Sequence, residues 1–131
     1  MNKTTFDYIV PDWPAPDNVQ SAITLRSSGS SSSPYDYFNL ATHVGDNPQQ
    51  VALNRQQLSQ QLKLEAQPLW LNQVHGTAVV DSASSNAIPD ADARFSDCSQ
   101  IPCVVLTADC LPVLLCNQQG TRVAAAHAGW R

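Results

Sequence analysis

The clearest periodic pattern of apolar and polar residues lies between positions 45 and 64, in GDNPQQVALNRQQLSQQLKL. Glutamine and arginine separate apolar residues that recur with near-helical spacing, which is typical of an amphipathic helix with one buried stripe. These apolar residues are Val51, Leu58 and Leu62. Asn47 can cap the helix, and Pro48 suits its first position. The pattern predicts one helix that packs an apolar face against the core.

Short apolar runs separated by turn residues predict extended structure in the second half of the chain. PLWLNQV (68–74) and TAVVD (77–81) are two such runs, and His75–Gly76 between them marks a bend. IPCVVL (101–106) and LPVLLC (111–116) predict buried strands on either side of the loop TADC.

The turn NQQG is followed by TRVAAAHA (121–128), which predicts a third buried strand with His127 near its end. Together with the helix, these runs predict an α+β fold with a β-rich mixed sheet core and covering helices. The serine-rich segment RSSGSSSSPYDYF (26–38) predicts a mobile surface loop, either a tolerated insertion or a flap over a site. Its composition favours the insertion.

Composition narrows the class of protein. The chain has 131 residues, enough for one domain with its own core, and 43% of them are hydrophobic, which excludes a disordered chain. A net charge of −4 and seven scattered basic residues argue against nucleic acid or an anionic membrane as a partner. The N-terminus lacks a secretory segment, and the most apolar stretch is too short to span a bilayer. We therefore expect a soluble cytoplasmic protein with four reduced cysteines.

His75, Cys110 and His127 each lie where an expected strand gives way to a loop, which is where scaffolds present functional side chains. Two imidazoles and a thiolate are suitable ligands for zinc or copper. Their separations of 35 residues (75 to 110) and 17 residues (110 to 127) require the whole fold to gather them. Three protein ligands leave a fourth position open, so the set is typical of a catalytic metal site.

The same residues allow other interpretations. Each histidine could be a hydrogen-bonded structural group, and Cys110 could be inert packing. Alternatively, Cys110 could be a thiolate nucleophile with His75 or His127 as its base, which would give hydrolase or amidase chemistry without a metal. The spacing alone leaves these alternatives open.

Several segments around these residues resemble the signature blocks of the YfiH-like family. The three main blocks are WLNQVHG (70–76), TADCLPVLLC (107–116) and VAAAHAGWR (123–131). Two further matches lie in residues 39–55, beginning NLATHVGDNP, and in DADARFS (90–96). Members of the family are described as polyphenol oxidoreductases or multicopper laccases, and also as purine nucleoside phosphorylases with adenosine deaminase activity. A bacterial branch is linked to the editing of peptidoglycan precursors.

The resemblance implies a zinc-dependent enzyme that cleaves adenosine, inosine, guanosine or methylthioadenosine with phosphate and also deaminates adenosine. It implies that His75, Cys110 and His127 are the catalytic residues and the metal ligands, for zinc in most descriptions and for copper as the alternative. The implied substrate contacts are Arg26, Asp92 and Arg131, and Asp92 could instead support the ligands. His43 is assigned no site role. The rivals are a metal-free Cys/His hydrolase that acts on a peptidoglycan precursor and a non-catalytic metal-binding fragment.

The chain departs from the family in two places. SSGSSSS replaces the family's glycine-rich turn after Arg26, and the chain stops inside the HAGWR block, whereas family members continue. We therefore expect residues 1–131 to be the N-terminal part of a single YfiH-like domain. The apolar run 101–127 would then lack part of its cover, which predicts self-association or pairing with a C-terminal fragment. The expected small-molecule partners are a purine nucleoside and phosphate.

Overall fold

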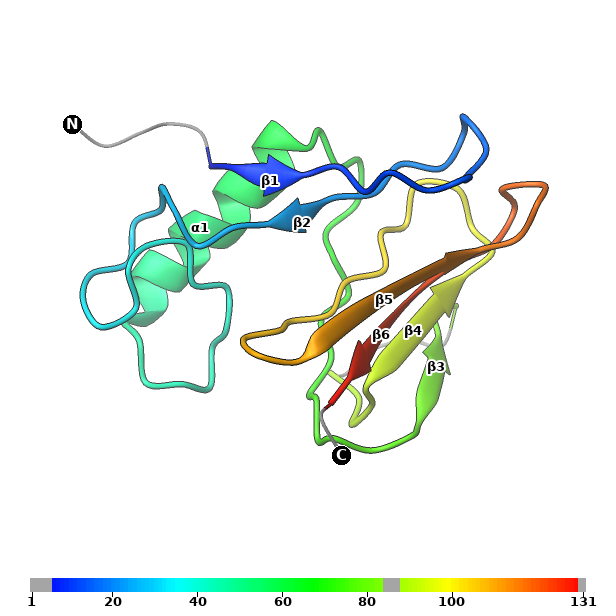
Figure 1. Cartoon of the computed structure of the whole chain (residues 1–131). Coiled ribbons are helices and arrows are strands. Elements are labelled where there is room, and N and C mark those ends of the chain that lie inside the picture. The colour runs from blue at the N-terminus through cyan, green and yellow to red at the C-terminus, as the bar shows by residue number, and fades with distance from the viewer. Residues whose placement is uncertain (1–5, 84–87, 130–131) are drawn as a thin grey trace. The chain divides into compact units, whose positions relative to one another are not determined.

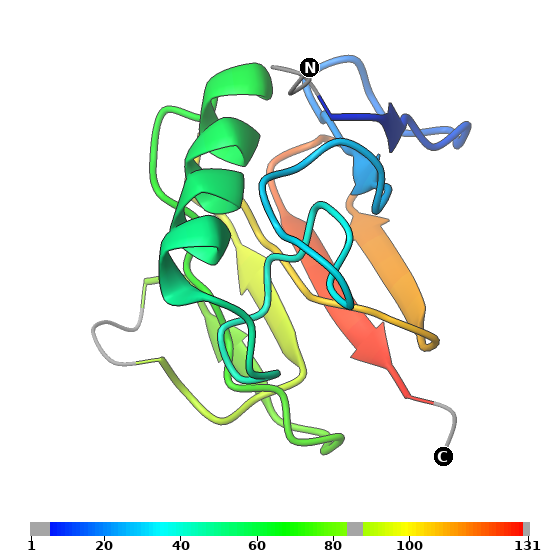
Figure 2. The same cartoon turned by 90° about the vertical axis from the view of Figure 1, so that its left-hand side faces the viewer.

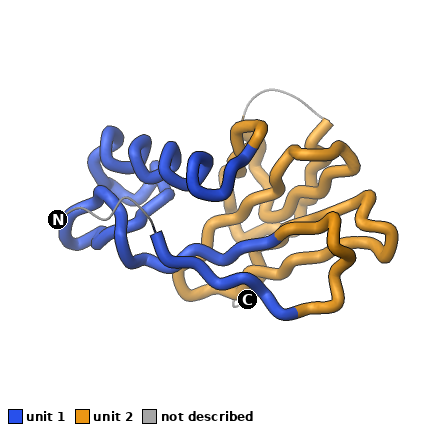
Figure 3. The backbone as a smooth tube through the Cα atoms, turned by 90° about the horizontal axis from the view of Figure 1, so that it is seen from above, with its two compact units in different colours: residues 1–12, 21–64 blue, residues 13–20, 65–131 orange. Residues whose placement is uncertain are grey.

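The computed structural model describes residues 6–83 and 88–129, which form two compact units (Figure 3). The first unit comprises residues 6–12 and 21–64, and the second comprises residues 13–20, 65–83 and 88–129. Each unit contains a β-sheet, and the first also contains the helix. The predicted α+β class with a mixed sheet is confirmed, and the described residues contain the one helix that the periodic pattern predicts.

The helix of the first unit forms where the periodic pattern predicts it. α1 spans Pro48–Gln61, and the Asn47 side chain accepts a backbone hydrogen bond of 2.8 Å from the first turn, as an N-cap does. Val51 and Leu58 are buried on α1, but so is Asn54, which the apolar pattern does not single out. The buried stripe of the helix is therefore partly polar.

Two short strands, drawn in Figures 1 and 2, and an aromatic pair complete the first unit. β1 (Tyr8–Ile9) pairs antiparallel with β2 (Ile23–Thr24). Phe6 and Phe38 are both buried, and their rings stack with centroids 4.5 Å apart. These two rings bring the N-terminal segment to the end of the serine-rich segment.

Asn54 organises the serine-rich segment. It accepts the Ser30 N–H at 2.7 Å and donates to Ser31 Oγ at 2.9 Å, and Ser31 is only 2% exposed. Gly29 packs against neighbouring backbone so tightly that a Cβ there would lie 2.6 Å from Phe38 Cα. The predicted surface loop is exposed at residues 32–34, whereas Ser30 and Ser31 are anchored by the buried amide of Asn54.

Four strands form the sheet of the second unit (Figure 1): β3 (Val79–Asp81), β4 (Ala93–Ser96), β5 (Leu111–Cys116) and β6 (Val123–Ala128). Their order is β3-β4-β6-β5, so β3 and β5 are the edges. β3 runs parallel to β4, and the other neighbours are antiparallel, which makes the sheet mixed.

One side chain holds the turn between β5 and β6. Asn117 Oδ1 accepts the N–H groups of Thr121 and Arg122 at 2.8 and 3.1 Å, and its Nδ2 donates to Thr121 Oγ1 at 2.7 Å. Gly120 has a φ of +68°, a conformation that glycine adopts readily. This turn confirms the NQQG prediction and pairs all six residues of β5 with those of β6.

The two faces of the four-stranded sheet differ in how far their side chains are buried. Arg94 lies opposite Ala125 in the β4–β6 ladder, and both are buried on one face together with His127, two residues along β6. The other face, here called the open face, carries large apolar side chains in solvent. These are Val79, Leu111 and Leu115, which are 59%, 65% and 54% exposed. The prediction that β5 is buried is therefore wrong, because Leu111 and Leu115 are exposed and the other four residues of the strand are only half-buried.

Two of the predicted extended runs differ from the structure. Residues 101–106 form no strand, because Pro102 offers no N–H for a ladder and the Leu106 backbone is bonded to the Gln73 side chain. Residues 68–74 form only an isolated bridge between Asn72 and Asp90. An apolar run indicates burial, but it does not reveal whether a neighbouring strand is present to pair with it.

All four cysteines are free. No helix in the described part of the chain has the length and apolar character needed to cross a bilayer.

Candidate metal centre

Three side chains singled out from the sequence come together in the second unit. His75, Cys110 and His127 each offer one ligand atom, and these atoms all lie within 4.8 Å of one another. The two imidazole rings meet edge to face, with centroids 4.8 Å apart and an interplanar angle of 75°. The fold therefore gathers residues that lie far apart in the sequence into one cluster.

The donor set fits a zinc-sized ion. Zn–N and Zn–S bonds of about 2.0–2.3 Å in tetrahedral geometry place ligand atoms about 3.3–3.8 Å apart. The observed limit of 4.8 Å is therefore about 1 Å wider than a filled site requires, and small side-chain rotations would close the gap. Imidazole and thiolate are also ligands that copper accepts, so the cluster alone does not fix the metal.

Asp92 fixes the orientation of His127. Its Oδ2 lies 2.7 Å from His127 Nδ1, and both side chains are only 4% exposed. Because a carboxylate accepts, His127 carries its proton on Nδ1 and leaves the lone pair of Nε2 free for a ligand. The backbone strengthens this contact, since the His127 N–H donates to the Asp92 carbonyl at 2.7 Å.

The same carboxylate holds the bend that carries His75. Asp92 accepts the backbone N–H groups of Val74, His75 and Gly76 at 2.9–3.0 Å. Burial alone would raise the pKa of Asp92, but the bonds from His127 and from these three N–H groups outweigh it and lower the pKa to about 2. Asp92 is therefore charged at neutral pH and connects the segments of both histidines.

His75 lies at the bend predicted from the sequence, and its backbone is unusual. Its φ is +58°, a left-handed conformation that few residues other than glycine adopt without cost. The three hydrogen bonds that the N–H groups of this bend donate to Asp92 stabilise that conformation. Gly129 passes close to the ring, because a Cβ at that position would lie 3.0 Å from His75 Cδ2.

Cys110 is half-buried and comes directly before β5. Its Sγ donates to Asp109 Oδ1 at 3.7 Å. Cys98 has the same local arrangement, with its Sγ donating to Asp97 Oδ1 at 3.8 Å, but it is exposed and does not belong to the cluster. Cys98 is therefore a natural control for experiments on Cys110.

The remaining predicted site residues do not all lie near the cluster. Arg26 belongs to the first unit, where its Nε donates to the Asp36 carbonyl at 2.9 Å, and its role as a substrate contact stays a prediction. Arg131 lies outside the described residues. Asp92 uses its carboxylate oxygens on His127 and the His75 bend, which favours the supporting role over the substrate contact. His43 is exposed in the first unit.

Sequence reasoning missed Gln73. Its Oε1 accepts the Leu106 N–H at 2.6 Å, and its Nε2 donates to the Leu106 carbonyl at 2.7 Å. The available signal was its place inside WLNQVHG, two residues before His75. The sequence alone does not distinguish a hydrogen-bonded glutamine from a solvated one, because its partner Leu106 lies 33 residues away.

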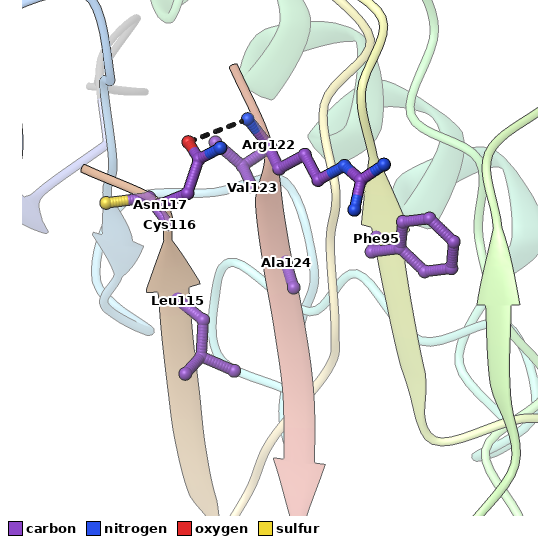
Figure 4. A pocket seen from close by; sticks show the side chains of 7 residues that line it. All are labelled: Phe95, Leu115, Cys116, Asn117, Arg122, Val123 and Ala124. Carbon is purple, nitrogen blue, oxygen red and sulfur yellow. Dashed lines mark hydrogen bonds between the residues drawn. The ribbon is translucent and has the colours of Figure 1, made fainter. Parts of the chain in front are cut away.

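A separate hollow of about 330 Å³ lies at the far end of β5 from Cys110 (Figure 4). Its lining is mostly apolar, and Asn117 and Arg122 also contribute to it, with the Arg122 side chain extending toward Phe95. It is lined by Phe95, Leu115, Cys116, Asn117, Arg122, Val123 and Ala124. None of the three clustered side chains lines this hollow.

Comparison with known proteins identifies several relatives. Residues 20–131 match the family model described as "Multi-copper polyphenol oxidoreductase laccase". The chain is 49% identical over 124 residues to "Purine nucleoside phosphorylase PA4543" of Pseudomonas aeruginosa, covering 95% of this chain and 50% of the relative. It is equally similar to "Purine nucleoside phosphorylase YfiH" of Escherichia coli, at 49% identity over 94% of this chain and 51% of the relative.

Solved structures agree with these sequence matches. The crystal structure of Neisseria meningitidis protein NMB0706 superimposes with a TM-score of 0.87 at 51% identity, covering 94% of this chain and 50% of that chain. YlmD from Geobacillus stearothermophilus gives a TM-score of 0.77 at 27% identity. The chain spans about half the length of the curated relatives it matches.

Proposed function

Because the chain belongs to the multi-copper polyphenol oxidoreductase laccase family, we propose that residues 1–131 are the N-terminal part of a single metal-dependent enzyme domain. We further propose that the whole protein is a purine nucleoside phosphorylase. The observation that carries the proposal is the cluster of His75, Cys110 and His127, whose ligand atoms lie within 4.8 Å of one another. The printed names of relatives at 49% identity support the reaction class.

The proposed ligands are His75, Cys110 and His127, and the proposed metal is zinc rather than copper. Imidazole nitrogen and thiolate sulfur are both ligand types that zinc binds, and three ligands leave a position open toward substrate. When bound, zinc acts as a Lewis acid in sites of this kind. Asp92 keeps the Nε2 lone pair of His127 free and holds the bend at His75 in place.

The substrates follow from the same family. We propose that the whole protein cleaves adenosine, inosine, guanosine or methylthioadenosine with phosphate and that it also deaminates adenosine. Arg26 and Arg131 are the proposed phosphate contacts, since a planar guanidinium can bind two phosphate oxygens at once. The four free cysteines fit a reducing compartment such as the cytoplasm.

Metal analysis paired with a nucleoside phosphorolysis assay tests the proposal. The purified chain should carry about one zinc, as a site with three protein ligands would. The double variant Cys110→Ser/His127→Ala should lose it. Cys98→Ser is the matched control and should keep it, because its thiol has the same contact to a preceding aspartate but does not belong to the cluster. Equal zinc in the double variant and the control would refute the metal site.

The activity assay should be repeated on a protein with the full length of the relatives. Turnover by the longer protein and none by the 131-residue chain would support a metal-binding fragment that needs the remaining length for activity. Alkylation of Cys110 distinguishes the metal-free alternative, in which Cys110 is a nucleophile acting on a peptidoglycan precursor. A Cys110 labelling rate that responds to neither chelator nor added zinc would favour that hydrolase.

A further inference from the structure

The loops that carry His75 and Cys110 are joined by a side chain that holds no ligand atom. Gln73 makes two bonds to one residue, since its Oε1 accepts the Leu106 N–H at 2.6 Å and its Nε2 donates to the Leu106 carbonyl at 2.7 Å. Both bonds are partly buried and span 33 residues of sequence. The side-chain amide thus replaces the pair of hydrogen bonds that a neighbouring strand would otherwise make.

We propose that Gln73 is a positioning residue of the metal centre, which clamps the Cys110 loop to the His75 bend and so holds the ligand atoms close before a metal binds. This inference rests on the metal site proposed above. Gln73 lies two residues before His75, and Leu106 lies four residues before Cys110. Because these separations are short, a shift of the Gln73–Leu106 contact would also shift His75 and Cys110.

The clamp completes a set of three links among the three ligand segments. Asp92 links the His75 bend to His127 through its hydrogen bonds. The β5–β6 ladder links Cys110 to His127, because Leu111 follows Cys110 and pairs with Ala128. Gln73 supplies the third link, between the His75 bend and the approach to Cys110. The other two links connect these two loops indirectly, through His127 and its strand.

The chemistry of the clamp requires glutamine. A glutamate at position 73 would keep the acceptor for the Leu106 N–H but would place a second oxygen against the Leu106 carbonyl. An asparagine would keep the amide but lacks one methylene group, so it would not reach both backbone groups at 2.6–2.7 Å. An alanine removes both bonds and leaves the Leu106 backbone unsatisfied where it is partly buried.

Gln73→Glu and Gln73→Ala test the clamp, with Asn72→Ala as the matched control. Asn72 is the neighbouring amide, and its Nδ2 makes one exposed hydrogen bond of 2.7 Å to Asp90. Competition with a chromophoric chelator should show zinc affinity lowered about 10–100-fold in both Gln73 variants, as for other residues that support metal ligands. Asn72→Ala should keep the affinity of the unaltered chain. Cobalt substitution should show a weaker thiolate-to-cobalt absorption band in the Gln73 variants only, which a loss of stability alone would not produce.

Hydrogen exchange of the Leu106 N–H tests the clamp without metal and without a variant. In the metal-free, unaltered chain this amide should exchange slowly, and exchange at the rate of an exposed loop would overturn the inference even if both variants failed to fold. Unchanged zinc affinity in the Gln73 variants would also overturn it. An unaltered chain that binds no zinc would instead refute the proposed metal site, while slow exchange at Leu106 would still support the clamp itself.

Discussion

Replacing Asp92 with asparagine keeps the shape of the side chain but changes the hydrogen bonds it can make. Its carboxylate accepts four bonds, three from the backbone of the His75 bend and one from His127 Nδ1. If the amide oxygen of Asp92→Asn takes the place of Oδ1, the bonds from Val74 and Gly76 survive. The amide nitrogen then replaces Oδ2 and faces the His75 N–H, donor against donor.

The consequence for His127 is a change of tautomer. Facing an N–H donor, its Nδ1 must accept, so the proton moves to Nε2, the nitrogen that the proposed metal needs. Zinc affinity should therefore fall about 10–100-fold, the range for loss of a residue that supports a metal ligand. Loss of the bond from the His75 N–H costs about 1.5–3 kcal/mol, the bond to His127 survives only as a weaker neutral one, and the lower cost of burying a neutral amide offsets part of this. We expect the free energy of unfolding to fall by about 2–4 kcal/mol.

Asp90→Asn is the matched control for this experiment. It removes the same charge from the same PDADA segment, where Asp90 is exposed and accepts one side-chain bond of 2.7 Å from Asn72. Urea unfolding measures the stability of each variant, chelator competition measures zinc affinity, and ¹⁵N NMR of the imidazole identifies the tautomer. The reasoning fails if Asp92→Asn matches Asp90→Asn in stability and zinc affinity and His127 still carries its proton on Nδ1.

Other predictions concern the first unit, the cysteines and the open face. Asn54→Leu should lower the free energy of unfolding by about 2–4 kcal/mol, because the Ser30 N–H, Ser31 Oγ and the Asn39 carbonyl all lose their bonds to this side chain. Urea unfolding checks this, and the exposed neighbour change Gln56→Leu should have little effect. Because burial raises the pKa of the Cys103 thiol, iodoacetamide should label the exposed Cys98 first, and peptide mass spectrometry showing the reverse order would contradict this. Because the open face exposes large apolar side chains, light scattering should give a mass above the 14.2 kDa of one chain. Leu115→Lys on that face should reduce the mass, and a monomeric unaltered chain would refute this self-association.

Short sequence motifs, such as helix caps and turns, predict the parts of the fold that depend on neighbouring residues. Asn47 and Pro48 marked the start of α1, and a turn sequence marked the link between β5 and β6. The bend at His75 was equally visible, since a glycine follows it between two extended runs. The strand predicted at 101–106 is wrong, because an apolar sequence indicates burial, whereas a strand also needs a partner with free backbone groups.

The supporting parts of the site could not be predicted in the same way. The three candidate ligands have characteristic residue types, so they could be named before any distance was known. Asp92 could be named only through the family resemblance and Gln73 not at all, because their roles depend on partners 35 and 33 residues away. The burial of Asn54 could not be predicted for the same reason. A polar residue on a helix is usually solvated, and only its contacts with the serine-rich segment explain its burial.

The turn at residues 117–122 has a consequence for His127. β6 reads VAAAHA, and its alanines are so alike that their side chains hardly distinguish one alignment with β5 from another. A slip of one residue would rotate His127 from the buried face of the sheet to the open one, because side chains alternate along a strand. The hydrogen bonds of Asn117 and the left-handed Gly120 oppose that slip from the end of the hairpin remote from Cys110. Insertion or deletion of one residue in this turn would thus dismantle the cluster without altering any of its side chains.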